Sequence, residues 1–318
     1  MKRKKFAVVT TFSHEGYKAY GKQMIKTFNK HWPDDVHLYV YYDVKPSEQS
    51  SKIHYRNLNE SCPGLVSFKE RRQIRSEINE RLKKATQGKA GYKWDAVRFA
   101  HKVYAIHHAS NTINADYLIW LDGDTISFEN VTMKLLNFLV DDENYTTYIG
   151  RPRRFPECGF VTYNMKHKYH SEFMDRFVGL YEEDTIFNES QWHDSWLFDR
   201  IRERMVDEGK IKSRMINEPY TNKNPFMNCI LGLYVDHTKG GRKHETGGSA
   251  KKCAAWRLKL RAEQERTAVD VYSHYREKQF AHWSSIGKHN KHPHKFMREL
   301  FLDATKNFNK NTNVSKRK

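Results

Sequence analysis

The run Tyr117-Leu118-Ile119-Trp120-Leu121 is the feature that most constrains the fold of this chain. A short, continuous apolar run predicts a strand that is covered on both faces, as the strands of a parallel sheet are. Other short strands alternate with amphipathic helices along the chain. We expect strands at residues 6–11, 36–42, 117–121, 145–149, 159–163 and 230–235, and helices at residues 16–30, 68–85, 94–109, 131–140, 170–181 and 195–206. This alternation predicts an α/β fold with a mainly parallel sheet flanked by helices.

Length and composition exclude several other classes of protein. A chain of 318 residues is long enough for a substantial core, and an aromatic content of 14% argues against intrinsic disorder. No apolar run approaches the roughly 18 residues that a membrane-spanning helix needs. The four cysteines are scattered without a Cys-x-x-Cys pair, which favours reduced thiols over a disulfide framework. We therefore expect a cytoplasmic protein, of a bacterium or of a phage-infected cell.

The positive charge is concentrated in the last fifth of the chain. Residues 250–318 contain 17 Lys and Arg against 6 Asp and Glu, an excess of 11 within a total net charge of +18. Aromatic residues are interspersed among these basic residues. We expect residues 1–249 to form the main α/β domain and residues 250–318 to form a basic, helical extension that attracts a polyanion. A merely solvated helical cap is the alternative.

Two carboxylates follow the apolar strand directly, since Asp122 and Asp124 flank Gly123. Residues i and i+2 of a strand point to the same side, and a small middle residue lets the chain turn there. Carboxylates at the carboxyl end of a parallel strand suit a hard divalent cation, such as Mn²⁺ or Mg²⁺, that also holds a diphosphate. An ordinary Asp-Gly turn is the simpler alternative, because Asp-x-Asp is a common pattern.

A second motif is His-x-x-Gly-x-x-Lys, formed by His237, Gly240 and Lys243 directly after the strand expected at residues 230–235. A histidine can complete the coordination of a cation that two carboxylates already hold. The glycine lets backbone amides approach an anion, and the lysine can neutralise phosphate oxygens. Together with the two carboxylates, this motif favours a site for a metal and a diphosphate over a basic surface loop.

On these motifs, residues 5–249 resemble a GT-A type glycosyltransferase, which uses nucleotide-sugar donors. The Asp-x-Asp strand end matches Asp122 and Asp124, and the late motif is similar to that of the glycogenin-like and lipopolysaccharide galactosyltransferase group. A rival for the late histidine is His282, which has a longer spacing to its glycine and lies in the extension. We prefer His237 as the third metal ligand because of its spacing and its position after a strand.

The resemblance implies further donor-binding residues. Thr10 and Thr11 end the first expected strand, where this fold receives the nucleoside base, and Asp43 ends the second. Arg98 and Lys102 are four residues apart on the helix before the metal strand, so they share one face. The family often has a basic residue there that reaches the donor phosphates. Ordinary surface charge is the alternative for both.

Two acidic residues are candidates for contact with the transferred sugar or the acceptor. Asp194 lies where related enzymes place such a carboxylate, which is a general base in an inverting enzyme. Its structural alternative is an N-cap for the helix expected from Ser195. Glu157 is a weaker candidate, at the start of the strand expected at residues 159–163.

The sequence therefore predicts metal-dependent transfer of a sugar from a nucleoside diphosphate sugar, with UDP-sugar implied by the resemblance. Two acceptors compete: DNA that carries a hydroxymethylated base, which the basic extension slightly favours, and a lipid-linked or cell-surface glycan at the cytoplasmic membrane face. An alternative of another class is a nucleic-acid-binding protein on an inactive scaffold. A sugar nucleotidyltransferase is disfavoured because no glycine-rich loop follows Thr11.

Overall fold

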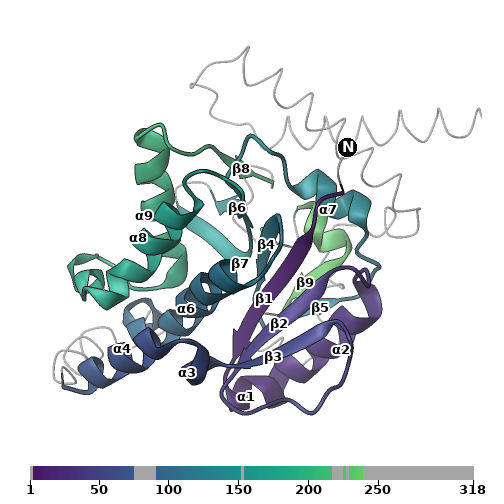
Figure 1. Cartoon of the computed structure of the whole chain (residues 1–318), viewed down its shortest axis with the longest axis horizontal. Helices are drawn as coiled ribbons and strands as arrows, with labels where there is room; N and C mark the ends of the chain where they lie inside the picture. The colour runs from purple at the N-terminus through teal and green to yellow at the C-terminus, as the bar shows by residue number, and fades with distance from the viewer. Residues whose placement is uncertain (1–2, 75–90, 152–153, 217–224, 227–228, 239–318) are drawn as a thin grey trace, which may run out of the picture.

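A seven-stranded sheet with the strand order β3-β2-β1-β4-β7-β6-β8 forms the centre of the protein (Figure 1). The computed structural model describes residues 3–74, 91–151, 154–216, 225–226 and 229–238. The strands of the large sheet are β1 (Phe6–Phe12), β2 (His37–Tyr42), β3 (Ile53–Asn57), β4 (Tyr117–Leu121), β6 (Thr146–Arg151), β7 (Arg154–Asn164) and β8 (Ser213–Met215). A separate two-stranded antiparallel sheet pairs β5 (Thr125–Ser127) with β9 (Val235–His237).

All strands of the large sheet except β7 run in the same direction. Strand β1 pairs in parallel with β2 and β4, and β2 pairs in parallel with β3. Strand β7 is antiparallel to both β4 and β6, and β6 is parallel to β8. The predicted fold class, a mainly parallel sheet flanked by helices, is confirmed.

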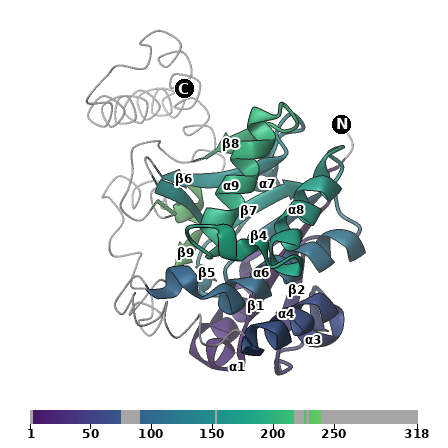
Figure 2. The same ribbon diagram turned by 90° about the vertical axis from the view of Figure 1, so that its left-hand side faces the viewer.

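Helices cover both faces of this sheet (Figures 1 and 2). One face carries α3 (Leu58–Ser61), α4 (Pro63–Ile74), α6 (Ala96–Thr112), α8 (His170–Glu182) and α9 (Asp194–Asp207). The other face carries α2 (Lys22–His31) and α7 (Met133–Leu139), and α1 (His14–Gly16) leads into α2 through one turn of π-helix. The result is a three-layer sandwich with one hydrophobic core on each side of the sheet.

Strand β4 lies in the middle of the sheet, and its burial agrees with its sequence. All five of its residues are buried, and alternate residues belong to opposite cores. Leu118 and Trp120 face the core under α6, whereas Ile119 and Leu121 face the core under α2 and α7. A strand buried on both faces must be apolar throughout, which explains why this run has no alternation.

The strand expected at residues 230–235 is wrong. A turn of 3₁₀ helix occupies Ile230–Leu233, and the strand β9 begins only at Val235. Periodicity alone does not distinguish a short apolar run in a strand from a buried helical turn. Asp236 and His237 consequently lie within a strand and not in the loop after it, and this strand pairs with β5 outside the large sheet.

Some predicted features lie outside the described residues. These are residues 75–85 of the helix expected at 68–85, the boundary at residue 249, and the extension at residues 250–318. The described part of that helix is α4, which begins earlier than expected, at Pro63. Proline is favoured at the first position of a helix because that position needs no amide donor.

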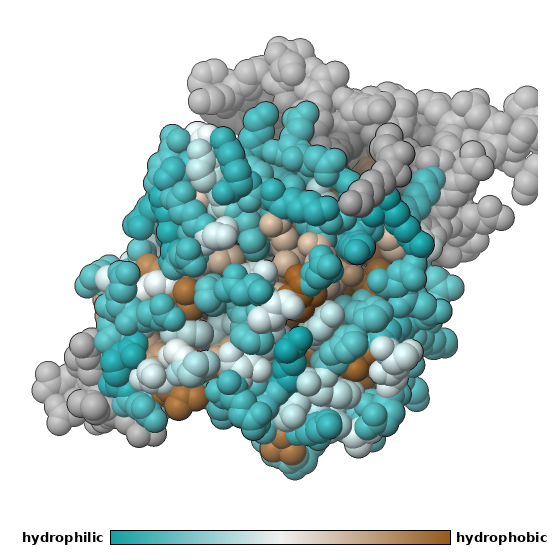
Figure 3. All heavy atoms as spheres, in the orientation of Figure 1, coloured by the Kyte–Doolittle hydropathy of each residue, from teal (hydrophilic) through white to brown (hydrophobic). Residues whose placement is uncertain are grey.

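The visible surface is mainly hydrophilic, with smaller hydrophobic areas between polar side chains (Figure 3). Cys62, Cys158 and Cys229 are buried, and burial raises the pKa of the Cys62 thiol to about 12. Within the described ranges, none of the helices combines the length and the apolar character that crossing a membrane requires.

Candidate functional site

A pocket of about 550 Å³ opens at the carboxyl ends of β1, β2 and β4. Ligands of open α/β sheets bind in the crevice at this end of the strands. The helix α6 and the start of α9 complete its walls. The lining residues are Thr11, Phe12, Ser13, Tyr20, Asp43, Asp95, Val97, Arg98, Phe99, His101, Lys102, Trp120, Asp122, Gly123, Asp124 and Asp194.

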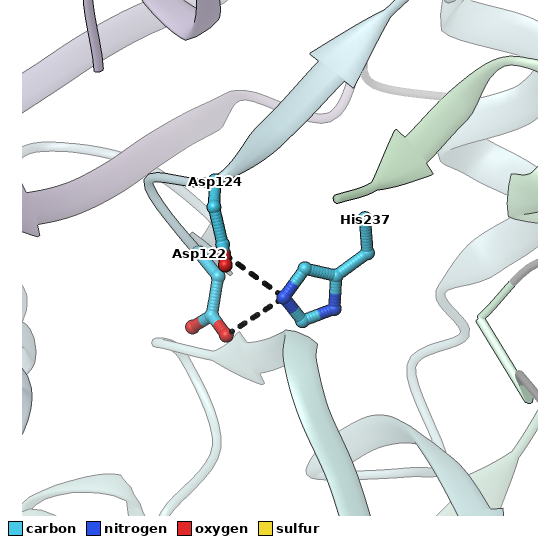
Figure 4. A group of neighbouring side chains, drawn as sticks. All are labelled: Asp122, Asp124 and His237. Carbon is cyan, nitrogen blue, oxygen red and sulfur yellow. Dashed lines mark hydrogen bonds and ion pairs between the residues drawn. The ribbon is translucent and has the colours of Figure 1, made fainter. Parts of the chain in front are cut away.

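Asp122, Asp124 and His237 converge beside this pocket (Figure 4). His237 Nε2 lies 2.9 Å from Asp124 Oδ1 and 3.4 Å from Asp122 Oδ2, and one potential ligand atom from each residue falls within 4.8 Å of the others. His237 is 3% exposed, whereas the side chain of Asp122 is 29% exposed and borders the pocket. Two carboxylates and one imidazole therefore face a common point.

The backbone holds the two carboxylates at the end of β4. The amide of Asp122 donates to the carbonyl of Gly159 on the neighbouring strand β7, at 2.9 Å. Gly123 packs so closely against β1 that a Cβ there would lie 2.9 Å from the ring of Phe12. The glycine between the carboxylates is thus needed for close packing as well as for the turn.

Pairing between β5 and β9, which lie far apart in the sequence, brings His237 to the carboxylates. Thr125 pairs with His237 across these strands, and Thr238 donates both its amide and its hydroxyl to the carbonyl of Asp124, at 2.9 and 2.7 Å. Residues 113 positions apart in the sequence are thereby held within hydrogen-bonding distance.

The far side of the His237 ring is also enclosed. Glu157 Oε1 lies 3.4 Å from His237 Nδ1, and the ring of Phe226 meets the imidazole edge-on with centroids 5.4 Å apart. A Cβ on Gly159 would lie only 2.5 Å from His237 Nδ1, so the imidazole packs directly against the backbone of β7. The orientation of His237 is therefore fixed by its neighbours.

Lys102 links the two carboxyl-bearing walls of the site. Its Nζ donates to Asp194 Oδ2 at 2.6 Å, to the carbonyl of Cys158 at 2.6 Å and to Asp122 Oδ1 at 3.3 Å. Burial by itself would lower the pKa of Lys102, but the negative charges of Asp122 and Asp194 outweigh it and raise this pKa. Lys102 is consequently a buried ammonium at the floor of the pocket.

Asp194 does not cap the helix α9, so the structural alternative for this residue is wrong. The N-cap is His193, whose ring Nδ1 accepts from the amide of Trp196. The ring Nε2 of His193 lies 3.0 Å from Gln191 Oε1. Because another residue satisfies the helix end, the carboxylate of Asp194 is left to pair with Lys102 in the pocket wall.

The structure divides the remaining predicted donor residues into two groups. Thr11, Asp43 and Arg98 line the pocket, and Asp43 and Arg98 are exposed there. Thr10 is fully buried and does not line the pocket, because adjacent residues of a strand point to opposite faces. Glu157 is 5% exposed, lies behind His237 and does not line this pocket.

Three residues named from the sequence lie outside the described part of the chain: Gly240, Lys243 and His282. Within the described part of the chain, His237, the preferred histidine, lies at the carboxylates.

Sequence reasoning missed Trp120 as part of the site. Its indole Nε1 donates to Asp122 Oδ1 at 2.6 Å, and its ring lies under the Lys102 ammonium with 4.6 Å between Nζ and the centroid. The i, i+2 relation of Trp120 and Asp122 along β4 was a usable signal, since both side chains then point to the same side.

Comparisons with known proteins find similarity to solved structures but not to protein families or curated proteins. No protein-family model matches the sequence, and no curated protein matches it. Among solved structures, the apo-form glycosyltransferase GlyE of Streptococcus pneumoniae TIGR4 is similar at 15% sequence identity and a TM-score of 0.36. The match covers 66% of this chain and 44% of that chain, so this chain corresponds to less than half of GlyE. A likeness of this degree does not establish a shared activity.

Proposed function

We propose that this protein is a metal-dependent glycosyltransferase that moves a sugar from a nucleoside diphosphate sugar to a hydroxyl group. The convergence of Asp122, Asp124 and His237 at a pocket on the carboxyl edge of a parallel sheet carries this proposal. Such an edge is where nucleotides bind in open α/β sheets, and a carboxylate-rich metal site suits a diphosphate. The sequence resemblance to GT-A type glycosyltransferases points to the same chemistry.

The donor set at this point fits a divalent cation. Carboxylate oxygens suit Mg²⁺ and Mn²⁺, and an imidazole nitrogen adds affinity for a transition metal such as Mn²⁺. A ligating histidine usually presents its other ring nitrogen to a carboxylate or carbonyl, and Glu157 lies at that nitrogen of His237. When bound, the cation would hold the diphosphate and stabilise the negative charge on the leaving nucleotide.

The pocket has room for the donor along the ends of β1, β2 and β4. We place the nucleoside near Thr11 and Asp43 and the diphosphate near Asp122 and Asp124, with uridine as the expected base. Arg98 is exposed at the pocket wall, where its guanidinium can neutralise phosphate oxygens. From the motif we also predict that Gly240 lets backbone amides approach the diphosphate and that Lys243 neutralises phosphate oxygens.

Asp194 and Lys102 form the part of the pocket where the sugar is transferred. Their 2.6 Å contact fixes the carboxylate of Asp194 at the pocket wall, where it can accept a hydrogen bond from a sugar or acceptor hydroxyl. Lys102 also contacts Asp122, so it couples the position of this wall to the position of the metal site. We assign Asp194 to sugar or acceptor contact and Lys102 to positioning.

For the acceptor we propose a hydroxymethylated base in DNA. The support is the net charge of +18, most of which comes from residues 250–318. A lipid-linked or cell-surface glycan at an anionic membrane face is the alternative acceptor. Because the extension lies outside the described residues, the assay below is designed to separate the two.

The test is a transfer assay with a panel of radiolabelled nucleotide sugars and Mn²⁺. The acceptors are hydroxymethylated DNA, unmodified DNA and a lipid-linked glycan, and the matched variant is Asp124→Asn. We expect label to enter hydroxymethylated DNA only with wild type and metal. Label in the glycan alone would replace the DNA acceptor. If wild type and Asp124→Asn bound DNA equally, and wild type neither hydrolysed nor transferred any donor, the protein would be a nucleic-acid-binding protein on an inactive scaffold.

A further inference from the structure

We propose that four rings beside the pocket form a docking surface for an unstacked nucleobase of a nucleic-acid acceptor, an inference that rests on the proposed function. The rings belong to Tyr92, Phe99, Phe155 and His193, which we call the aromatic rim. His193 is at its centre, with ring centroids 4.3 Å from Phe155, 5.9 Å from Tyr92 and 6.0 Å from Phe99. Tyr92 and Phe99 also meet, at 6.5 Å.

The aromatic rim borders the place where transfer is proposed to occur. Phe99 itself lines the pocket, and His193 is followed directly by Asp194, which lines it too. The rings come from four elements: the 3₁₀ helix Gly91–Trp94, α6, β7 and the N-terminus of α9. A ring docked on this surface would therefore lie next to the Asp194 carboxylate.

One ring of the rim is open to a ligand. Tyr92 is 44% exposed. The other large hydrophobic side chains exposed in the described part of the chain, Val44, Val206 and Met215, are not aromatic. An exposed tyrosine held against other rings offers a rigid, flat apolar face at low entropic cost. Such faces stack on bases without regard to sequence.

Basic side chains surround these rings. The Arg98 guanidinium lies 5.8 Å from the centroid of Phe99, and the Arg151 guanidinium lies 5.0 Å from that of Phe155. Arg154 is exposed beside Phe155. The nearby acid Asp95 is engaged, since its carboxylate caps α6 by accepting from the amide of Arg98.

The combination of rings packed edge-to-face and nearby cations points to the ligand class. Single-stranded nucleic acid binds to surfaces where aromatic side chains stack on bases and basic groups follow the phosphates. An enzyme that modifies a base must also take that base out of the duplex stack, and aromatic side chains commonly hold it there. A neutral sugar ring would use the aromatic faces but would not require the surrounding positive charge.

The test compares two fluorescent oligonucleotides of equal length by anisotropy, using the full chain. One carries bases, and the other is an abasic sugar-phosphate strand. Contacts to phosphate, including any from residues 250–318, are common to both, so the ratio of the two affinities reports base stacking alone. We expect wild type to prefer the strand with bases by about tenfold or more. Tyr92→Ala should abolish this preference, and Tyr92→Phe should retain it.

Tyr169→Ala is the matched control. Lys168 and Lys210 lie 4.7 and 6.0 Å from the ring of Tyr169, so this is also an aromatic–cation group. The amide of Met165, four residues before Tyr169, donates to the carbonyl of Asp116, which directly precedes β4. Tyr169 therefore lies toward the amino end of β4, whereas the pocket lies at its carboxyl end. Tyr169→Ala should leave the base preference unchanged.

Equal preference in wild type and Tyr92→Ala would overturn the proposal, as would no preference in wild type. Loss of binding to a neutral oligosaccharide in Tyr92→Ala, without loss of the base preference, would make the rim a glycan surface instead. Metal-dependent UDP binding, measured on the same proteins by calorimetry, tests the proposed function separately. The rim inference fails alone if UDP binding persists while the base preference is absent.

Discussion

Acidic and basic side chains balance each other in solvent between α8 and α9, whereas carboxylates outnumber cations at the pocket. In the first region, Glu172 and Glu208 share the two cations Arg176 and Lys210, with four ion-pair contacts between 2.5 and 2.9 Å. We call these residues the surface network. Hydrogen bonds from Arg176 and Lys210 lower the pKa of Glu208 to about 2.

The described carboxylates at the pocket are shared between one ammonium and one imidazole. Lys102 contacts Asp122 and Asp194, and Asp124 faces His237. We call Lys102, Asp122, Asp124 and Asp194 the pocket-floor cluster. Buried or half-buried carboxylates that lack enough cations are costly for folding, because their desolvation is not offset. The difference teaches that the surface network pairs its charges in solvent, whereas the described part of the pocket-floor cluster holds two carboxylates against one buried ammonium.

The largest expected effect on stability is that of Lys102→Met. Removing the ammonium leaves Asp122 and Asp194 facing each other without compensation, which should cost about 3 kcal/mol or more in the free energy of unfolding. The measurement is urea denaturation of the wild type, the single variant and the double variant with Asp194→Asn. The double variant should regain much of the stability, because one of the two opposed charges is gone.

Lys52→Met is the matched control for this comparison. Lys52 is also buried, and its Nζ donates to the carbonyl of Trp32 at 2.7 Å and to Asp34 at 3.2 Å. The side chain of Asp34 is fully exposed, so no buried carboxylate is left behind. A loss of only about 1–2 kcal/mol is expected. If Lys102→Met and Lys52→Met lowered the free energy of unfolding equally, the carboxylates of the pocket-floor cluster would not depend on the Lys102 ammonium more than an exposed carboxylate depends on Lys52.

A glycine substitution should disturb the metal site without changing any ligand. The Cβ of Gly159→Ala would displace the ring of His237, and we expect Mn²⁺ affinity in calorimetry to fall by about 10- to 100-fold, as for loss of a supporting contact. Gly179→Ala is the control, since the nearest atom to its Cβ is 3.9 Å away. That change lies inside α8 and should stabilise slightly. If Gly159→Ala left the affinity for Mn²⁺ unchanged, His237 would not be a ligand of the metal.

A smaller effect is expected from Glu157→Gln. This change keeps the size of the side chain but removes the charge that faces His237 Nδ1 at 3.4 Å. Mn²⁺ affinity should fall by about tenfold, whereas the affinity for UDP without metal should stay the same. An equal loss in both measurements would show that Glu157 supports the pocket generally and not the histidine.

The smallest effect is expected in the surface network. Glu208→Gln should change the midpoint of thermal unfolding little at neutral pH, since exposed ion pairs contribute little to stability. The sign of its pH dependence follows from the lowered pKa. The contribution of Glu208 to stability is complete above its ordinary pKa of 4.5 and is lost as the pH falls through its lowered pKa of about 2. Wild type and variant should therefore converge in acid, and a difference that grows in acid would contradict this account.

Local patterns were sufficient to predict much of the fold and part of the site. The apolar run before Asp122 identified the central strand, and the spacing of Asp122 and Asp124 identified one edge of it as a candidate metal site. These features depend on neighbouring residues only, so they are legible in the sequence. The prediction of His237 rested on the His-x-x-Gly-x-x-Lys spacing and its expected position after a strand, and the family resemblance agreed with it.

Contacts between distant parts of the chain were not predictable in the same way. The pairing of β5 with β9 and the position of Glu157 behind His237 each depend on tertiary packing. Thr10 was misassigned because the register of β1 decides which of two adjacent threonines faces the pocket.

The most direct measurement is an anomalous difference map from crystals grown with Mn²⁺ and UDP. The account predicts one strong peak about 2 Å from a carboxylate oxygen of Asp122 or Asp124 and from Nε2 of His237, with diphosphate oxygens beside it. Manganese bound elsewhere, or UDP bound in the pocket with no peak at these residues, would contradict the claim that this cluster is a metal site.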